Sequence, residues 1–128
     1  MNFQFEHHYT VAQANALLPQ IKAWFERLEV VSHRLTQLDK RLTGMVANGN
    51  DVGGDSVNRW VETLADLKEI FGEFQSRDIQ VKDLDRWLID FPSLRDDREI
   101  FLCWEKDEDQ VEYWHEIESG YAGREKLG

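Results

Sequence analysis

The feature that most constrains the fold is a stripe of apolar residues in the N-terminal third that recurs every three or four positions. It consists of Ala14, Leu18, Ile21, Phe25, Leu28, Val31, Leu35, Leu38, Leu42 and Met45. This spacing places the side chains on one side of an α-helix. One helix is therefore predicted over residues 11–47, about 55 Å long at ~1.5 Å per residue. Thr10 and Gln13 have the spacing of a capping box at its start.

A second stripe follows a polar, glycine-containing segment, residues 48–56, which is typical of a loop. The stripe consists of Val57, Trp60, Leu64, Leu67, Phe71 and Phe74. Asp55 or Ser56 can cap the helix that it predicts. Two heptad-like helices joined by a short polar loop are expected to pair antiparallel, as in a coiled coil. The helical hairpin is predicted over about residues 9–76.

The rest of the chain, about residues 78–128, has the character of a β-sheet. Strands are predicted at 79–82, 87–91, 99–104 and 111–117, with the second stopped by Pro92 and residues 106–109 as a hairpin connection. We expect three or four antiparallel strands with one face on the first helix. The predicted fold class is thus α+β, a long antiparallel helical hairpin packed on a small antiparallel sheet, with residues 1–128 as a single domain.

Charge is distributed unevenly along the sequence. Residues 1–50 carry five Lys or Arg and four Asp or Glu, whereas residues 51–128 carry ten and twenty-one. A negative field repels phosphate groups, so nucleic acid and anionic membrane surfaces are poor partners. Cations and basic protein surfaces are better ones, although acidity of this kind also serves plain solubility.

The sequence lacks the motifs of several protein classes. It contains no glycine-rich phosphate loop, no nucleophile elbow and no His-Glu-x-x-His pair. No apolar run approaches membrane-spanning length and the first residues do not resemble a signal peptide, so a cytoplasmic protein is expected. The single cysteine, Cys103, excludes an intramolecular disulfide and suits a reducing compartment.

Three carboxylates lie close together in the sequence at Asp83, Asp85 and Asp90. Asp83 and Asp85 are two residues apart, so in an extended segment they share a face. Such a pair could bind a hard cation through oxygen, or one member could have a raised pKa through like-charge repulsion. The alternative is that the carboxylates cap turns and pair with nearby basic residues.

His115 is the strongest single candidate for a functional residue. Strand alternation places it with Tyr113 and Ile117 on the expected core face, as a ligand or base, or else as a buried histidine fixed by a hydrogen-bonding partner. Arg124, in a glycine-rich tail, could close back on Asp83, Asp85 or Asp90. Cys103 is interpreted as a small buried apolar residue, because acidic surroundings disfavour a thiolate.

Several segments together resemble a known family. They are Thr10–Pro19, Val81–Pro92, Leu102–Trp104, Trp114–Glu116 and Gly120–Arg124. In this order, from about residue 9 to the end, they are similar to the domain-of-unknown-function 2203 family of bacterial proteins. The resemblance implies a small stand-alone bacterial protein and carries no established activity. The residues that match its motifs are Asp83, Asp85, Asp90, Trp104, His115, Gly120, Gly123 and Arg124.

Two functional hypotheses follow. The first, which favours a non-enzymatic role, is a protein-interaction or oligomerising module. Its basis is the long first helix, which extends beyond the second and could pair with a second copy, as a homodimer, or with another protein. The second is a cation- or small-ligand-binding protein that uses a divalent metal, with a metal-assisted hydrolase as one form of it. Its ligand-binding residues would be Asp83, Asp85, Asp90, His115 and Arg124, with Asp83, Asp85 and His115 as metal ligands.

Overall fold

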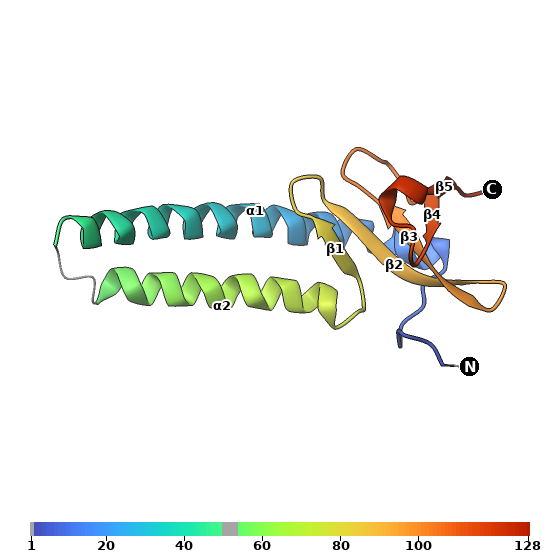
Figure 1. Ribbon diagram of the computed structural model, residues 1–128, viewed down its shortest axis with the longest axis horizontal. Helices are drawn as coiled ribbons and strands as arrows, with labels where there is room; N and C mark the ends of the chain where they lie inside the picture. Colours follow the sequence, from blue (N-terminus) through green and yellow to red (C-terminus); the bar gives the residue numbers. More distant parts are fainter. Residues whose placement is uncertain (1, 50–53) are drawn as a thin grey trace. The chain divides into compact units, whose positions relative to one another are not determined.

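The computed structural model describes residues 2–49 and 54–128 and confirms the α+β class. Its elements are α1 (Val11–Ala47), α2 (Asp55–Gln75), β1 (Gln80–Asp83), β2 (Leu88–Arg95), β3 (Arg98–Trp104), β4 (Tyr113–Glu116), the 3₁₀ helix η1 (Tyr121–Gly123) and β5 (Glu125–Lys126) (Figure 1). The strands form one antiparallel sheet in the order β1-β2-β3-β4-β5, so it has five strands where three or four were expected. Of the predicted loop over residues 48–56, residues 50–53 lie outside the described part.

The chain divides into two compact units, one comprising residues 1–22 and 74–128 and the other residues 23–73. The first unit holds the sheet with the start of α1, and the second holds the paired helices. The single-domain organisation stays a prediction. Within the described residues, no helix is long and apolar enough to cross a membrane.

The predicted start of the first helix is confirmed in atomic detail. The Thr10 backbone N–H donates to Oε1 of Gln13 at 3.0 Å, and the Gln13 N–H donates to Oγ1 of Thr10 at 3.1 Å. These reciprocal bonds satisfy two amides that a helix start otherwise leaves without partners. One turn later, Asn15 accepts the N–H of Val111 through its side-chain oxygen at 2.7 Å, which ties α1 to the segment before β4.

The two faces of the sheet are covered by different segments of its own unit. On one face, Phe91 contacts Tyr9 with ring centroids 5.4 Å apart, and Lys22 lies over the Trp104 ring at 6.0 Å, so this face meets the start of α1. On the other face, Phe101 contacts Phe5 at 5.5 Å. Residues 3–8, which we call the N-terminal segment, therefore cover this other face.

Pro92 does not stop the second strand, and that prediction is wrong. β2 continues through Pro92, which lies opposite Phe101, to Arg95. The last β2 residue with a partner on β1 is Asp90, so the nitrogen side of Pro92 faces an edge where β1 has ended. The Pro92 carbonyl on that side accepts the N–H of Tyr9 at 2.8 Å. Proline is tolerated where its missing N–H costs no ladder bond.

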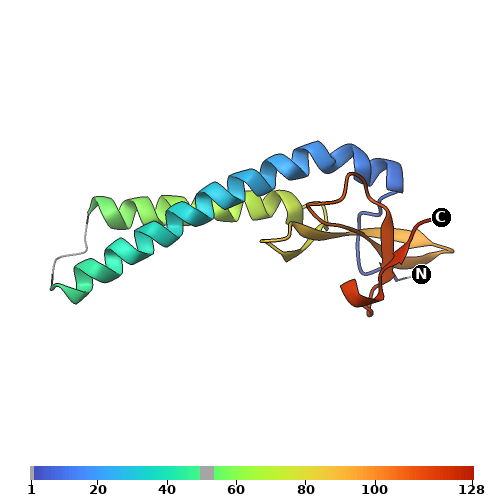
Figure 2. The same cartoon turned by 90° about the horizontal axis from the view of Figure 1, so that it is seen from above.

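The chain after β4 turns through residues 117–119 and the 3₁₀ helix η1 before it forms β5. β4 is shorter than the predicted strand 111–117, and the tail returns alongside it as β5, pairing Tyr113 with Lys126 and Trp114 with Glu125 (Figure 1 and Figure 2). A further backbone bond, from the Leu127 N–H to the Glu112 carbonyl at 2.7 Å, extends this pairing.

In the second unit, α1 and α2 run side by side in opposite directions, as predicted (Figure 1). The indole N–H of Trp60 donates to Oδ1 of Asp39 at 2.6 Å and joins the two helices. Val31 and Ile70 are buried. Towards the loop the stripe residues are only half-buried, among them Leu35, Leu38, Leu42, Met45, Val57, Trp60 and Leu64.

Candidate functional site

A polar cluster lies buried on the sheet face that the N-terminal segment covers. It consists of Asp90 on β2, Cys103 on β3 and His115 on β4, with exposed fractions of 3%, 1% and 1%. Asp90 and Cys103 are directly opposite each other, and His115 lies opposite Phe101, two residues before Cys103. Residues that oppose each other, or that are two apart, point to the same face. One potential ligand atom from each of the three side chains lies within 4.8 Å of the other two.

His115 has a hydrogen-bond acceptor at each ring nitrogen. Nδ1 lies 2.7 Å from the Glu116 carbonyl oxygen, and Nε2 lies 2.9 Å from Oδ1 of Asp90. Because a carbonyl can only accept, Nδ1 carries a proton and donates it. Burial disfavours the imidazolium, but the bonds to Asp90 and Glu116 outweigh that cost and raise the pKa of His115 above its usual 6.5.

Cys103 is the residue of this cluster that sequence reasoning missed. Burial, with the nearby Asp90 carboxylate, raises the pKa of the Cys103 thiol to about 12, so the free thiol stays protonated. It is buried, as predicted, but a polar group lies beside it. Its place in the cluster follows from the pairing of Asp90 with Cys103, and this pairing can be predicted only when the strand register is known.

Asp83 and Asp85 are not members of this cluster. Oδ1 of Asp83 accepts the backbone N–H groups of Asp85 and Arg86 at 3.0 and 3.1 Å, which caps the turn between β1 and β2. This is the turn-capping role that the sequence analysis left open. Among the described residues, the group of three or more potential metal ligands is Asp90, Cys103 and His115. Of the predicted site residues, the structure thus brings Asp90 and His115 together.

Arg124 closes back on the chain, but onto glutamates rather than onto the three predicted aspartates. Its guanidinium pairs with Glu108 and lies 3.8 Å from a Glu105 oxygen. It also stacks over the Tyr113 ring at 3.7 Å and the Tyr121 ring at 4.8 Å. The side chain is 10% exposed. These contacts make Arg124 the anchor of the tail that forms β5.

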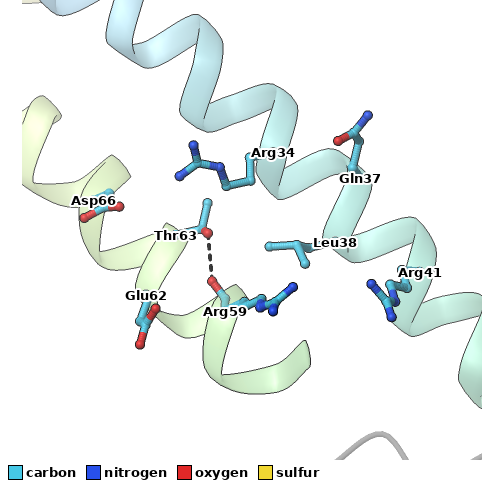
Figure 3. Close-up of a pocket in the computed structure, with 8 residues that line it drawn as sticks. All are labelled: Arg34, Gln37, Leu38, Arg41, Arg59, Glu62, Thr63 and Asp66. Atoms are coloured by element: carbon cyan, nitrogen blue, oxygen red, sulfur yellow. Dashed lines mark hydrogen bonds between the residues drawn. The ribbon is translucent and has the colours of Figure 1, made fainter. Parts of the chain in front are cut away.

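The described part of the paired helices carries at least three grooves, and one of them is lined by Ala23, Glu26, Arg27, Val30, Val31, Arg34 and Asp66. Two others differ in character. One is apolar and lined by Asp39, Leu42, Thr43, Val46, Ala47, Val57 and Trp60. The other is charged and lined by Arg34, Gln37, Leu38, Arg41, Arg59, Glu62, Thr63 and Asp66. In Figure 3, Arg34 extends from α1 towards α2, and Arg59 extends from α2 towards α1. The two grooves share no lining residue.

Comparison with known proteins identifies a family. Residues 7–127 match the family described as "Uncharacterized conserved protein (DUF2203)". No curated protein and no solved structure is detectably similar to the chain. The matched range includes α1, α2 and all five strands, and with them the buried cluster. The chain therefore belongs to the DUF2203 family of uncharacterised conserved proteins.

Proposed function

We propose that the protein is an interaction module that forms a homodimer through the apolar groove between its helices. The observation that carries this proposal is the exposure of apolar side chains at and beside this groove. Val46 on α1 is 62% exposed and Val61 on α2 is 53% exposed, while Leu42, Val57 and Trp60 are only half-buried. Two paired helices cannot enclose a stripe of apolar side chains on all sides. A second helix pair packed against the first buries the apolar side chains that stay exposed in a single copy.

The apolar groove is favoured over the charged groove as the interface. One of the seven residues that line the apolar groove is charged, compared with five of the eight in the other. That charged residue, Asp39, already accepts the Trp60 indole N–H. The central parts of protein interfaces are depleted in charged residues and enriched in aromatic residues.

Charge complementarity between the helices supports a second copy as the partner. Residues 23–47 carry four basic and three acidic side chains, whereas residues 55–73 carry two basic and five acidic ones. A two-fold arrangement that places α2 of one copy across α1 of the other brings opposite charges together at the rim. Such an interface is self-complementary, as a symmetric dimer requires.

Sedimentation analysis of matched variants tests the dimer. Val46→Glu inserts a charge into the lining of the apolar groove, whereas Val30→Glu inserts the same charge at a site that is 60% exposed and lines a different groove. The sixteen residues between them, at about 100° each, place Val30 on roughly the opposite side of α1. The wild type and Val30→Glu should be dimeric at about 100 μM, a concentration suited to affinities weaker than 1 μM. Val46→Glu should be monomeric with an unchanged helical circular-dichroism signal.

Salt provides a second readout. The chain has a formal charge of −10, so two copies repel each other over long range. Salt at 0.5 M NaCl screens both this repulsion and the attraction between opposite charges at the rim, so a dimer held by its apolar groove should persist at 0.5 M NaCl. A wild type that remains monomeric up to millimolar concentration at both salt levels would overturn the proposal, as would a Val46→Glu variant that remains dimeric.

A further inference from the structure

The buried cluster on the sheet combines three kinds of metal-binding atom in one place. Asp90 offers a carboxylate oxygen, Cys103 a sulfur and His115 a ring nitrogen, all within 4.8 Å of one another. They come from three adjacent strands whose register is fixed by the sheet ladder. We infer that these residues form a binding site for a transition-metal ion of the Zn²⁺ class. This inference is independent of the proposed dimer.

The donor set distinguishes between metal classes. Mg²⁺ and Ca²⁺ take oxygen ligands almost exclusively. A thiolate together with an imidazole selects Zn²⁺ or a related transition metal, and Cys, His and Asp are all ligands that Zn²⁺ uses. Ligand atoms of a tetrahedral Zn²⁺ site lie about 3.3–3.7 Å apart, given Zn–N and Zn–S bonds of about 2.0 and 2.3 Å. To reach that geometry, separations of up to 4.8 Å have to shorten and the 2.9 Å between Nε2 of His115 and Oδ1 of Asp90 has to lengthen.

His115 is already oriented for this role by a neighbouring group. Its Nδ1–H donates to the Glu116 carbonyl at 2.7 Å, which fixes the ring and directs Nε2 towards Asp90. Histidines that bind metal through one nitrogen typically donate the other N–H to a carbonyl or carboxylate, and this partner fixes the tautomer. The arrangement thus supplies both the ligand atom and the group that orients it.

Metal binding at this site releases two protons. Bond formation from Sγ of Cys103 to the metal displaces the thiol proton, and bond formation from Nε2 displaces the proton held between His115 and Asp90. Both protons leave to the buffer, and no oxidation or reduction occurs. The bound ion then lies among one thiolate, one carboxylate and one neutral imidazole, and its affinity rises with pH.

The position of the site points to a structural rather than a hydrolytic metal. All three side chains are buried. Beside them on β3, Phe101 contacts His115 with ring centroids 5.5 Å apart, and Phe5 of the N-terminal segment contacts Phe101 at the same distance. A catalytic ion needs a position open to substrate, whereas this cover closes the site. Three protein donors are the number typical of catalytic Zn²⁺ sites, which leave the fourth position to a water, so the burial of the site and not its ligand count argues for a structural ion.

Refolding the full, tag-free chain with Co²⁺ or Zn²⁺ present tests the inference, because the buried site is then accessible while it forms. Co²⁺ bound by a thiolate gives a near-ultraviolet sulfur-to-metal charge-transfer band, which reports Cys103 directly. We expect one ion per chain, that band, and a higher melting temperature with Zn²⁺. Cys103→Ala removes a ligand while leaving a small buried side chain. It should abolish the band and weaken Zn²⁺ binding by roughly a hundredfold or more, since loss of even an orienting partner costs about 10–100-fold.

Two matched controls make the result specific. Asp83→Asn alters a carboxylate outside the cluster, and His7→Ala removes a histidine in the N-terminal segment, so both variants should keep the charge-transfer band. A wild type that refolds without taking up either ion would overturn the inference. Uptake that survives in Cys103→Ala with unchanged affinity would overturn it equally, because the ion would then be bound elsewhere on this acidic chain.

Discussion

His115 on β4 contacts Asp90 on β2 directly, with Nε2 2.9 Å from Oδ1, although β3 lies between the two strands. Strands two positions apart in a sheet are about 9.5 Å apart, so the two side chains must lean towards each other across β3. The β3 residues nearest to this contact on the same face are Phe101, opposite His115, and the small Cys103, opposite Asp90. The small side chain at Cys103 leaves room for the contact.

Removing His115 should destabilise the metal-free protein strongly. His115→Phe fills the space but leaves the Asp90 carboxylate buried without its partner, and breaking a buried pair in this way costs about 3–5 kcal/mol. Urea unfolding followed by tryptophan fluorescence measures the change. The double variant Asp90→Leu/His115→Phe should recover at least about half of that loss, because an apolar pair replaces the ion pair. Equal losses in the single and double variants would contradict this account.

Arg124 should contribute more to stability than an exposed arginine in an ion pair does. Arg124→Ala removes the pairing with Glu108 and the stacking on Tyr113, and we expect a loss of about 2 kcal/mol. Arg98 pairs with Glu116 but is 54% exposed, so Arg98→Ala should cost less than about 1 kcal/mol. Arg124→Lys should not restore stability, because a lysine lacks the planar group that stacks on the tyrosine rings. Similar losses for Arg124→Ala and Arg98→Ala would contradict the anchoring role.

The N-terminal segment should detach in acid. Desolvation opposes ionisation of Asp78 and Glu99, but N–H groups from the segment outweigh it and hold the pKa of each carboxyl below its usual value of 3.8 or 4.5. Groups with a lowered folded-state pKa stabilise fully above the unfolded-state pKa and lose that contribution as the pH falls through the folded-state value. The segment should therefore be bound at pH 6 and lose its attachment progressively as the pH falls below the usual carboxyl pKa values of 3.8 and 4.5.

Nuclear magnetic resonance of the Gln4, Phe5 and His7 amides follows this detachment, because these N–H groups donate to the two carboxylates. Glu99→Gln should weaken attachment already at pH 7, with a smaller further change on acidification. Amide chemical shifts that do not respond to pH between 6 and 3 would rule out attachment of the N-terminal segment through these two carboxylates.

The turn between β2 and β3 should be improved by glycine. Asp96 and Asp97 have φ values of 50° and 65°, as a two-residue type I′ hairpin turn requires. Aspartate adopts this left-handed region at a cost that glycine avoids. Asp97→Gly should raise the free energy of unfolding by about 0.5–1 kcal/mol. Asp109→Gly removes the same charge where φ is not positive and should be neutral or destabilising. If both substitutions raised the free energy of unfolding equally, the gain would come from removal of the charge and not from the backbone conformation.

The helices could be predicted from the sequence because their signals are local. The stripe from Ala14 to Met45 and the capping box at Thr10 and Gln13 determine α1 through interactions within four residues. Burial along the stripe could not be predicted in the same way. Leu28 is buried while Leu42 is only half-buried, and this difference depends on which other segments lie nearby.

The candidate site could be predicted only in part because it depends on strand register. His115 was expected on the core face with Tyr113, and the two do share a face with Asp90, but it is the face opposite α1. Both faces of the sheet are covered, so alternation of polar and apolar residues could not distinguish them. Cys103 is flanked by apolar residues and gave no polar signal, although it lies opposite Asp90.

The two outermost strands have a consequence for how copies of the chain can associate. Long, flat edge strands invite pairing with strands of other molecules and lead to aggregation. Here β5 has two residues, and β1 has four with a register irregularity between Val81 and Asp83. Such short or irregular edges offer few consecutive unpaired amides and carbonyls to an incoming strand. The sheet is thus protected against growing from one molecule into the next.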